Sequence, residues 1–191
     1  MKKLLLSLVL VLVLVLSLAV PVLAAESEEI TVTYTPAYIS ISTTPTTWEM
    51  NSLTGDSKVR ADTLYYSNPG GDTVAPSATV VDGECRFTTT NTSNIAIDVT
   101  LNMADFTGGS DPMVNSNTGS NGVGTFGAYG WYSGMTYTSK VITQATGSDV
   151  LMDALAATTD LKWGMEIETQ SDAWTGITQS TGTLTISIAE D

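Results

Sequence analysis

Apolar residues recur at every second position along most of this chain. The segment 95–103 is the clearest case, because apolar side chains occupy its odd positions and polar or small ones its even positions. Two later segments, 161–168 and 183–189, repeat the alternation. A period of two is typical of strands with one buried and one solvated face, which form antiparallel sheets packed in pairs. The positions predicted to face the core are Ile95, Ile97, Val99, Leu101, Met103, Leu161, Trp163, Met165, Ile167, Leu184, Ile186 and Ile188.

Shorter alternating runs lie nearer the N-terminus. Ile30, Val32 and Tyr34 alternate with threonines, and Ile39 and Ile41 alternate with serines. Prolines interrupt these runs, and proline within a sheet is confined to edges, strand starts and turns. The N-terminal runs are therefore predicted to be edge strands or short strands between turns.

The dipeptide Asp82-Gly83 predicts the two-residue turn of a β-hairpin over residues 77–90. In the register that this turn sets, Val80 lies opposite Cys85, and both share the apolar face with Phe87. A buried cysteine behaves as a small apolar side chain. The pattern therefore predicts that Cys85 packs inward instead of serving as a reactive thiol.

One segment departs from the period of two. Within Asp149–Ala157 the apolar residues follow helical spacing, with Ser148 or Asp149 as a candidate N-cap. This spacing predicts one short helix at an end of the sandwich. The stretch Gly108–Gly124 is rich in Gly, Asn and Ser and is expected to form a long loop.

Together these elements predict an all-β fold, a single antiparallel β-sandwich of about seven to ten strands with one short helix. The stretches Cys85-Arg86-Phe87, Asn91-Thr92-Ser93 and Ile95-Ala96-Ile97-Asp98-Val99 support that class, because a strand there ends in an Asn-Thr/Ser turn and an alternating strand follows. This arrangement resembles secreted prokaryotic surface β-sandwiches. The resemblance implies an Ig-like or jelly-roll sandwich and carries no active residues.

Residues 1–24 have the layout of a cleavable export signal. Lys2 and Lys3 precede an apolar run to Val20, and Val22 and Ala24 supply the small residues of a cleavage site. The alternative is an uncleaved anchor, but the run is short for a bilayer, which needs about 20 apolar residues. We therefore expect a secreted or cell-surface domain, residues 25–191, with no membrane span after cleavage.

The charge of the mature chain limits its partners. Loss of Lys2 and Lys3 leaves five basic residues against 20 acidic ones, a net charge of −15. A nucleic-acid partner is excluded on this ground, because a phosphate backbone needs a positive surface. With Cys85 as the only cysteine the chain forms no internal disulfide, which favours a prokaryotic source over a small secreted eukaryotic domain.

The chain also lacks histidine, which removes histidine-based triads and every histidine-ligated metal site. Carboxylate catalysis, as in a glycosidase, is the remaining enzymatic route. Its candidates Asp98, Glu166 and Glu168 lie on faces predicted to be solvated. We expect the protein not to be an enzyme.

The sequence requires no cofactor, and calcium is the most credible ion for it to bind. Carboxylate, amide and backbone oxygens are the ligands of hard cations, and the long Gly-rich loop offers them. The alternative is an ordinary polar loop whose Asn and Asp residues make turns. The candidate ligands are Asp105, Asp111, Asn115, Asn117 and Asn121.

Aromatic residues crowd the segment 126–137, which is interleaved with glycines. They predict either a platform for a glycan or a partner protein, or core and edge-strand packing. The candidate ligand-binding residues are Tyr129, Trp131, Tyr132 and Trp174.

Three functions remain, in this order. The first is a non-enzymatic structural or adhesive role at the cell surface, with association of the protein with itself or an envelope partner through an edge strand. Ile30–Tyr34 is a candidate donor strand, and calcium is expected to strengthen the association by screening acidic repulsion. The second is a glycan- or calcium-binding module. The third is a carboxylate-dependent hydrolase.

Overall fold

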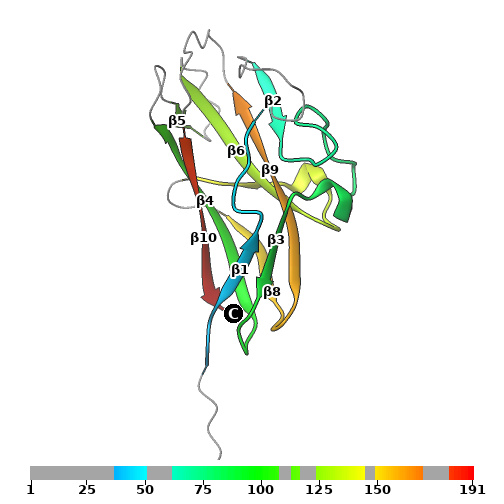
Figure 1. Ribbon diagram of the computed structural model, residues 1–191, viewed down its shortest axis with the longest axis vertical. Helices are drawn as coiled ribbons and strands as arrows, with labels where there is room; N and C mark the ends of the chain where they lie inside the picture. The colour runs from blue at the N-terminus through cyan, green and yellow to red at the C-terminus, as the bar shows by residue number, and fades with distance from the viewer. Residues whose placement is uncertain (1–36, 51–61, 108–112, 117–123, 145–148, 170–180) are drawn as a thin grey trace, which may run out of the picture. The chain divides into compact units, whose positions relative to one another are not determined.

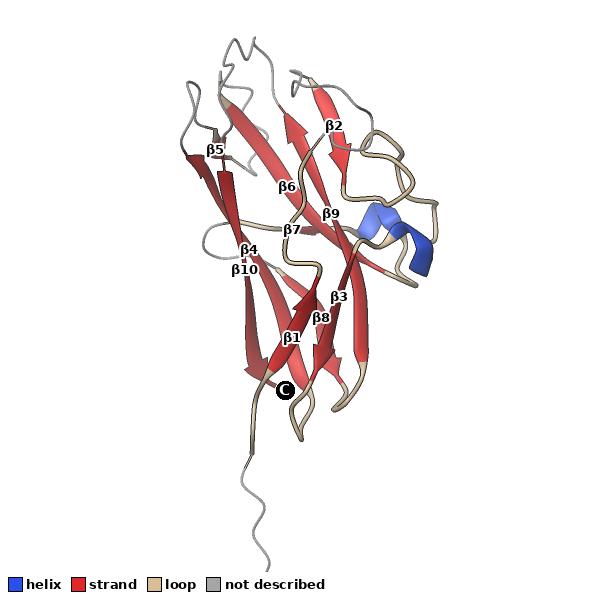
Figure 2. Ribbon diagram, viewed as in Figure 1, coloured by secondary structure: helices blue, strands red, loops and turns tan. Residues whose placement is uncertain are grey.

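Two β-sheets pack face to face in the computed structural model of this chain, and nearly all strand pairs are antiparallel (Figure 1). The structure describes residues 37–50, 62–107, 113–116, 124–144, 149–169 and 181–191. The predicted all-β sandwich is confirmed. Figure 2 shows that strands dominate the described part of the chain. Its helical residues form two short 3-10 turns, η1 (Asp82–Glu84) and η2 (Tyr137–Ser139).

The larger sheet has seven strands, and β9 (Asp160–Thr169) lies at its centre. The strand order is β1-β3-β9-β6-β5, with β2 also paired to β9 and β7 paired to β6. Every pair is antiparallel except β5 with β6. Besides β9, the strands of the larger sheet are β1 (Ile41–Thr44), β2 (Thr63–Tyr66), β3 (Phe87–Asn91), β5 (Val114–Asn115), β6 (Thr125–Tyr132) and β7 (Val141–Ile142).

The smaller sheet has three strands in the order β10-β4-β8. Its central strand is β4 (Ile97–Thr107), and the flanking strands are β8 (Val150–Leu155) and β10 (Thr181–Glu190). The pairing of β10 with β4 runs almost the full length of β10, with one irregularity between Gly182 and Leu184.

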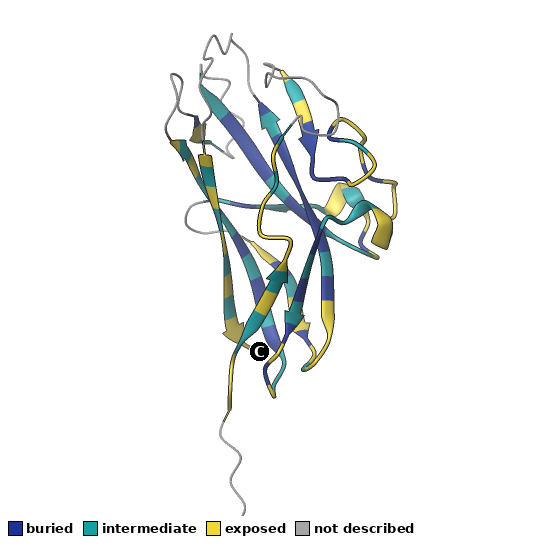
Figure 3. Cartoon of the chain, viewed as in Figure 1, coloured by how far each residue is buried: buried dark blue, intermediate teal, exposed yellow. Residues whose placement is uncertain are grey.

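The core between the two sheets follows the predicted alternation. From Ile97 to Met103 the odd residues of β4 are buried, and Leu161 to Ile167 supply the buried odd positions of β9. Leu184, Ile186 and Ile188 of β10 pack against this core and are half-buried. Figure 3 shows the resulting stripes of buried and exposed positions along these strands.

The predicted hairpin over residues 77–90 is wrong. Asp82-Gly83 does make a turn, but the segment before it pairs with a distant partner: the backbone N–H of Val80 donates to the carbonyl of Met135 at 3.0 Å. The segment after the turn becomes β3 and pairs with β1 and β9. The carboxylate of Asp82 forms a salt bridge with Lys162 of β9, whose ammonium nitrogen lies 2.5 Å away.

The predicted helix at Asp149–Ala157 is also wrong, because this segment contains strand β8. Its pairing with β4 matches Leu155 to Ile97 and Met152 to Val99, so three steps along β8 correspond to two along β4. A second shift follows toward Val150. Each bulge adds a residue to β8. Leu151 and Leu155 are both buried, and a separation of four residues fits one face of a helix as well as one face of a strand.

A second, smaller core covers the outer face of the larger sheet. Its buried members are Tyr66, Val80, Trp131 and Met135. Gly164 of β9 lies beneath the indole of Trp131, and a Cβ atom there would come within 2.5 Å of the ring. The absence of a side chain at residue 164 thus makes room for a fully buried tryptophan on this face.

The lone cysteine belongs to this second core. Cys85 packs half-buried against the cluster. Burial raises the pKa of its thiol to about 12. Cys85 thus packs against the cluster that contains Val80, but Phe87 lies in the main core between the sheets, so the predicted face shared by all three residues is wrong.

Replacement of Gly164 by alanine is expected to destabilise the fold by about 1–3 kcal/mol, the usual cost of overpacking a filled site. The measurement is the free energy of unfolding in urea. Gly83→Ala is the matched control, since a Cβ at Gly83 would meet no atom within 4 Å. Equal stability of the two variants would contradict the close packing of Trp131 on Gly164.

Candidate functional site

The aromatic residues predicted to bind a ligand occupy different environments. Trp131 is 0% exposed, so its indole presents no face to a ligand in this structure. Tyr129 and Tyr132 are half-buried on β6. Trp174 lies outside the described residues. Packing of Trp131 in the second core therefore agrees with the alternative interpretation of this segment.

Glu166 is buried, which corrects the prediction that its face of β9 is solvated. The segment that contains η2 folds over this face, and the Glu166 side chain is 0% exposed beneath it. The ammonium of Lys140 lies 2.6 Å and 2.7 Å from the two carboxylate oxygens of Glu166. The hydroxyl of Tyr137 donates a hydrogen bond to the same carboxylate.

Aromatic rings enclose this ion pair. The Lys140 ammonium lies 4.5 Å from the ring centroid of Tyr129 and 5.1 Å from that of Tyr137. Burial, followed by the hydrogen bond to Glu166, raises the pKa of Tyr137. Burial also raises the pKa of Tyr66 and of Tyr129. The tyrosines therefore stay protonated at neutral pH, and both oxygens of Glu166 are engaged by donors.

Two of the five predicted calcium ligands lie in the described residues. Asp105 is exposed near the end of β4, and its carboxylate accepts the backbone N–H of Asn115 at 2.8 Å. The Asn115 amide nitrogen donates to the carbonyls of Met103 and Thr143. The buried Oδ1 of Asn115 has no hydrogen-bond partner. Asp111, Asn117 and Asn121 lie outside the described residues, so the predicted calcium loop stays a prediction.

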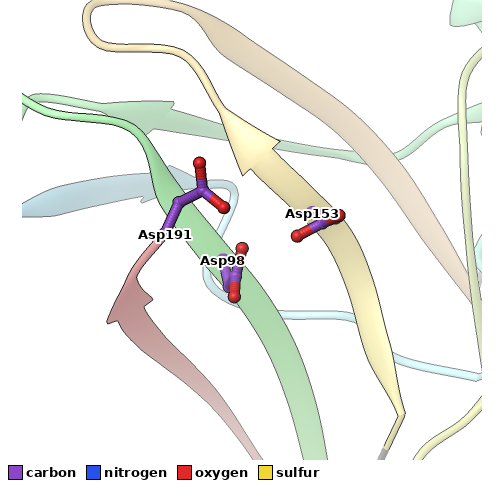
Figure 4. A group of neighbouring side chains, drawn as sticks. All are labelled: Asp98, Asp153 and Asp191. Carbon is purple, nitrogen blue, oxygen red and sulfur yellow. The ribbon is translucent and has the colours of Figure 1, made fainter.

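A different acidic group forms across the smaller sheet. Asp98 on β4, Asp153 on β8 and Asp191 after β10 each offer a carboxylate oxygen, and these oxygens lie within 4.8 Å of one another. Figure 4 shows the three side chains side by side across the sheet. Sequence reasoning missed this acidic triad because the register of three strands, not any spacing along the chain, brings its members together.

Part of the acidic triad has a structural task. Asp98 accepts a hydrogen bond from the backbone N–H of Ala154 at 3.1 Å. Ala154 has a φ of 52°, a conformation costly for a residue other than glycine. Asp98 thus stabilises the irregular backbone of β8. Its nearness to Asp153, through a hydrogen bond and through charge, raises the pKa of the Asp153 carboxyl.

Hard cations take oxygen ligands of this kind. Among the described residues the acidic triad is the group of carboxylates close enough together to contact one ion. Asp153 and Asp191 are exposed and Asp98 is half-buried, so water would complete the coordination of any such ion.

The chain matches no protein-family model, and a search of curated proteins finds no significant relative. No helix in the described part of the chain is long and apolar enough to cross a membrane.

Substitution of Lys140 by methionine is expected to cost about 3 kcal/mol of stability, because it leaves the buried Glu166 carboxylate without its cation. The double variant K140M/E166M should lose less than K140M alone, since it removes both charges. Urea unfolding measures both effects. The control K162M breaks an exposed ion pair and should change stability little. A larger loss in the double variant than in K140M would contradict the burial of this pair.

Replacement of Asp153 by asparagine is expected to raise the melting temperature at pH 7. A raised carboxyl pKa means that the folded state holds its proton more tightly, so ionisation lowers stability as the pH rises through the folded pKa. Asparagine avoids this loss, and its advantage should shrink below about pH 4, where the aspartate is protonated in both states. D149N, outside the triad, is the control. A lower melting temperature of D153N at pH 7 would contradict repulsion within the triad.

Proposed function

We propose that this protein is a non-enzymatic structural or adhesive protein of the cell surface or its surroundings, exported by residues 1–24, that associates through the open edge of β10. The partner strand comes from another copy or from an envelope protein. The observation that carries the proposal is the length and the uncharged character of this edge.

β10 is ten residues long, and within the described residues it pairs on one side only, with β4. It carries no charged residue and no proline from Thr181 to Ala189. An exposed strand edge presents unpaired backbone N–H and C=O groups that bind another strand. Soluble proteins usually block such edges with lysine, proline, bulges or short strands, and β10 has one irregularity, close to its start.

The other described edges are blocked in these ways. β8 is interrupted by two register shifts and by the unusual backbone of Ala154. β1 has four residues and ends directly before Pro45. β2, which among the described strands pairs only with β9, has four residues, and β5 and β7 have two each. Strand addition at the described sheets is therefore most favourable at β10.

The hydrogen-bond phase of β10 identifies the groups available to a partner. The N–H of Asp191 donates to the carbonyl of Ala96, and only alternate residues of an antiparallel pair exchange such bonds. By the register of the pair, the backbone groups of Thr185 and Ser187, which lie an even number of residues before Asp191, also form hydrogen bonds with β4. The backbone groups of Leu184, Ile186 and Ile188 consequently point away from the sheet.

Calcium is expected to strengthen the association. The mature chain carries a net charge of −15, so two copies repel each other, and cations screen that repulsion. Asp191 of the acidic triad directly follows β10, which places one acidic cluster at an end of the proposed contact.

The double substitution T185K/S187K tests the proposal on the mature chain. Lysines on the exposed face of the edge would repel one another across a strand contact between copies, and the expected loss of affinity is about tenfold, ~1.4 kcal/mol. The measurement is sedimentation equilibrium over a range of protein concentrations, with and without calcium.

The matched control is N102K/T100K, which places the same lysines on the neighbouring strand β4, directly opposite Thr185 and Ser187. Both variants lower the net negative charge equally. General charge repulsion alone therefore predicts stronger association in both, whereas edge pairing predicts weaker association in T185K/S187K alone. A chain that remains monomeric at every concentration and calcium level would contradict self-association through this edge and leave an envelope protein as the partner to test.

A further inference from the structure

We infer that the strand that pairs with β10 is β10 of a second copy, antiparallel to the first about a two-fold axis. This inference rests on the proposed association through the β10 edge and names its partner. The two three-stranded sheets would then join into one continuous sheet.

Strand length supports a second β10 as the partner. The outward backbone groups of Leu184, Ile186 and Ile188 need a strand long enough to satisfy all of them. Other described strands with an open edge have at most six residues, and the longest of these, β8, is interrupted by bulges. Among the described strands, β10 itself is the regular edge of matching length.

Charge supports the antiparallel direction. Glu190 and the acidic triad gather at one end of β10, whereas the strand from Thr181 to Ala189 is uncharged. A parallel pair would place the two acidic ends side by side. In an antiparallel pair these ends lie about 34 Å apart, as ten residues at ~3.4 Å each require. That separation exceeds the screening length of about 8 Å at physiological salt.

Side-chain packing supports the same contact. Leu184, Ile186 and Ile188 face the core but stay half-buried, because no described strand covers them on the open side. A second β10 would set the same apolar residues beside them and extend the core across the two-fold axis. On the outer face, Thr185 and Ser187 would meet uncharged neighbours, and β-branched threonine suits such cross-strand positions.

An isologous contact of this kind uses the same edge on both copies, so it closes at the dimer. A single strand pair buries little area, and interfaces below about 1,200 Å² are typical of weak complexes. We therefore expect a reversible dimer and not a filament grown through this edge.

Cysteine substitutions on β10 of the mature chain test the inference. Residues 185 and 187 would occupy the non-hydrogen-bonded pairs of the new contact, where facing side chains come close enough for a disulfide. T185C links two copies if residue 185 lies on the axis, and S187C does so if residue 187 lies there. If Ile186 lies on the axis, only the double variant T185C/S187C links. Mild oxidation followed by non-reducing electrophoresis and intact mass gives the readout.

The expected result is a disulfide-linked dimer from the double variant, and from T185C or S187C alone if its residue lies on the axis, with none from the control T100C on β4. Native Cys85, half-buried with its pKa raised, is present in every variant as a further control. The dimer fraction should rise with protein concentration and stop at two copies. Linked species larger than a dimer, or linking of T100C to the same extent, would overturn the inference.

A second variant separates this inference from the proposed function. V32P disrupts the alternating segment Ile30–Tyr34, the other candidate donor strand of this chain, and should leave association unchanged. Suppose that T185K/S187K weakens association, V32P abolishes it and no β10 cysteine links. The edge would then be used by the N-terminal segment of a neighbour, so the two-fold contact would be wrong and the proposed function would stand. Unaltered association in T185K/S187K would overturn both.

Discussion

The fold depends on the burial of both faces of β9. Its inward residues Trp163 and Met165 lie in the core between the sheets, and its outward residues Gly164 and Glu166 lie beneath a second layer of chain. A strand buried on both faces must satisfy whatever polar groups it carries, because an unpaired buried charge is very costly. Glu166 meets this requirement through Lys140 and Tyr137. The ion pair therefore constrains where the η2 segment can settle, and that segment covers Trp131.

The sequence was sufficient to predict the class of fold and the inward faces of β4, β9 and β10. Regular strands give a period of two, and these three strands are regular over most of their length. β8 was missed because the apolar residues Val150, Leu151 and Leu155 do not alternate with polar ones, and two bulges interrupt its pairing with β4. The hairpin at Asp82-Gly83 failed for another reason: a local turn does not determine the partners of its flanks. The backbone N–H of Val80 donates to the carbonyl of Met135, more than 50 residues away.

The candidate sites were harder to predict than the fold. Burial of Glu166 results from a covering segment that no periodicity of β9 reveals. The acidic triad results from the register of three strands, whereas the alternation along β4 shows only that Asp98 lies on the outer face. Trp131 was recognised as notable, but its role depends on Gly164, which is opposite to it on the neighbouring strand. In each case the missing information was a contact between residues far apart in the sequence.

The smaller sheet is asymmetric at its two edges. On one side, β8 carries bulges and a strained alanine held by Asp98, features that prevent regular pairing. On the other side, β10 is long and regular beyond its first residues. The charges of this sheet are distributed unevenly as well, with the acidic triad at one end of β10 and an uncharged stretch beyond it. Position along the strand thus determines how far acidic repulsion opposes a neighbour.

The state of Cys85 has a consequence for any assembly of this protein. Thiol–disulfide exchange proceeds through the thiolate. With a pKa raised to about 12, only roughly one thiol in 10⁵ is ionised at pH 7. In an oxidising compartment a reactive lone cysteine would join chains covalently, and the product would not dissociate on dilution. A Cys85 thiol that is so little ionised would leave the association proposed above non-covalent and reversible.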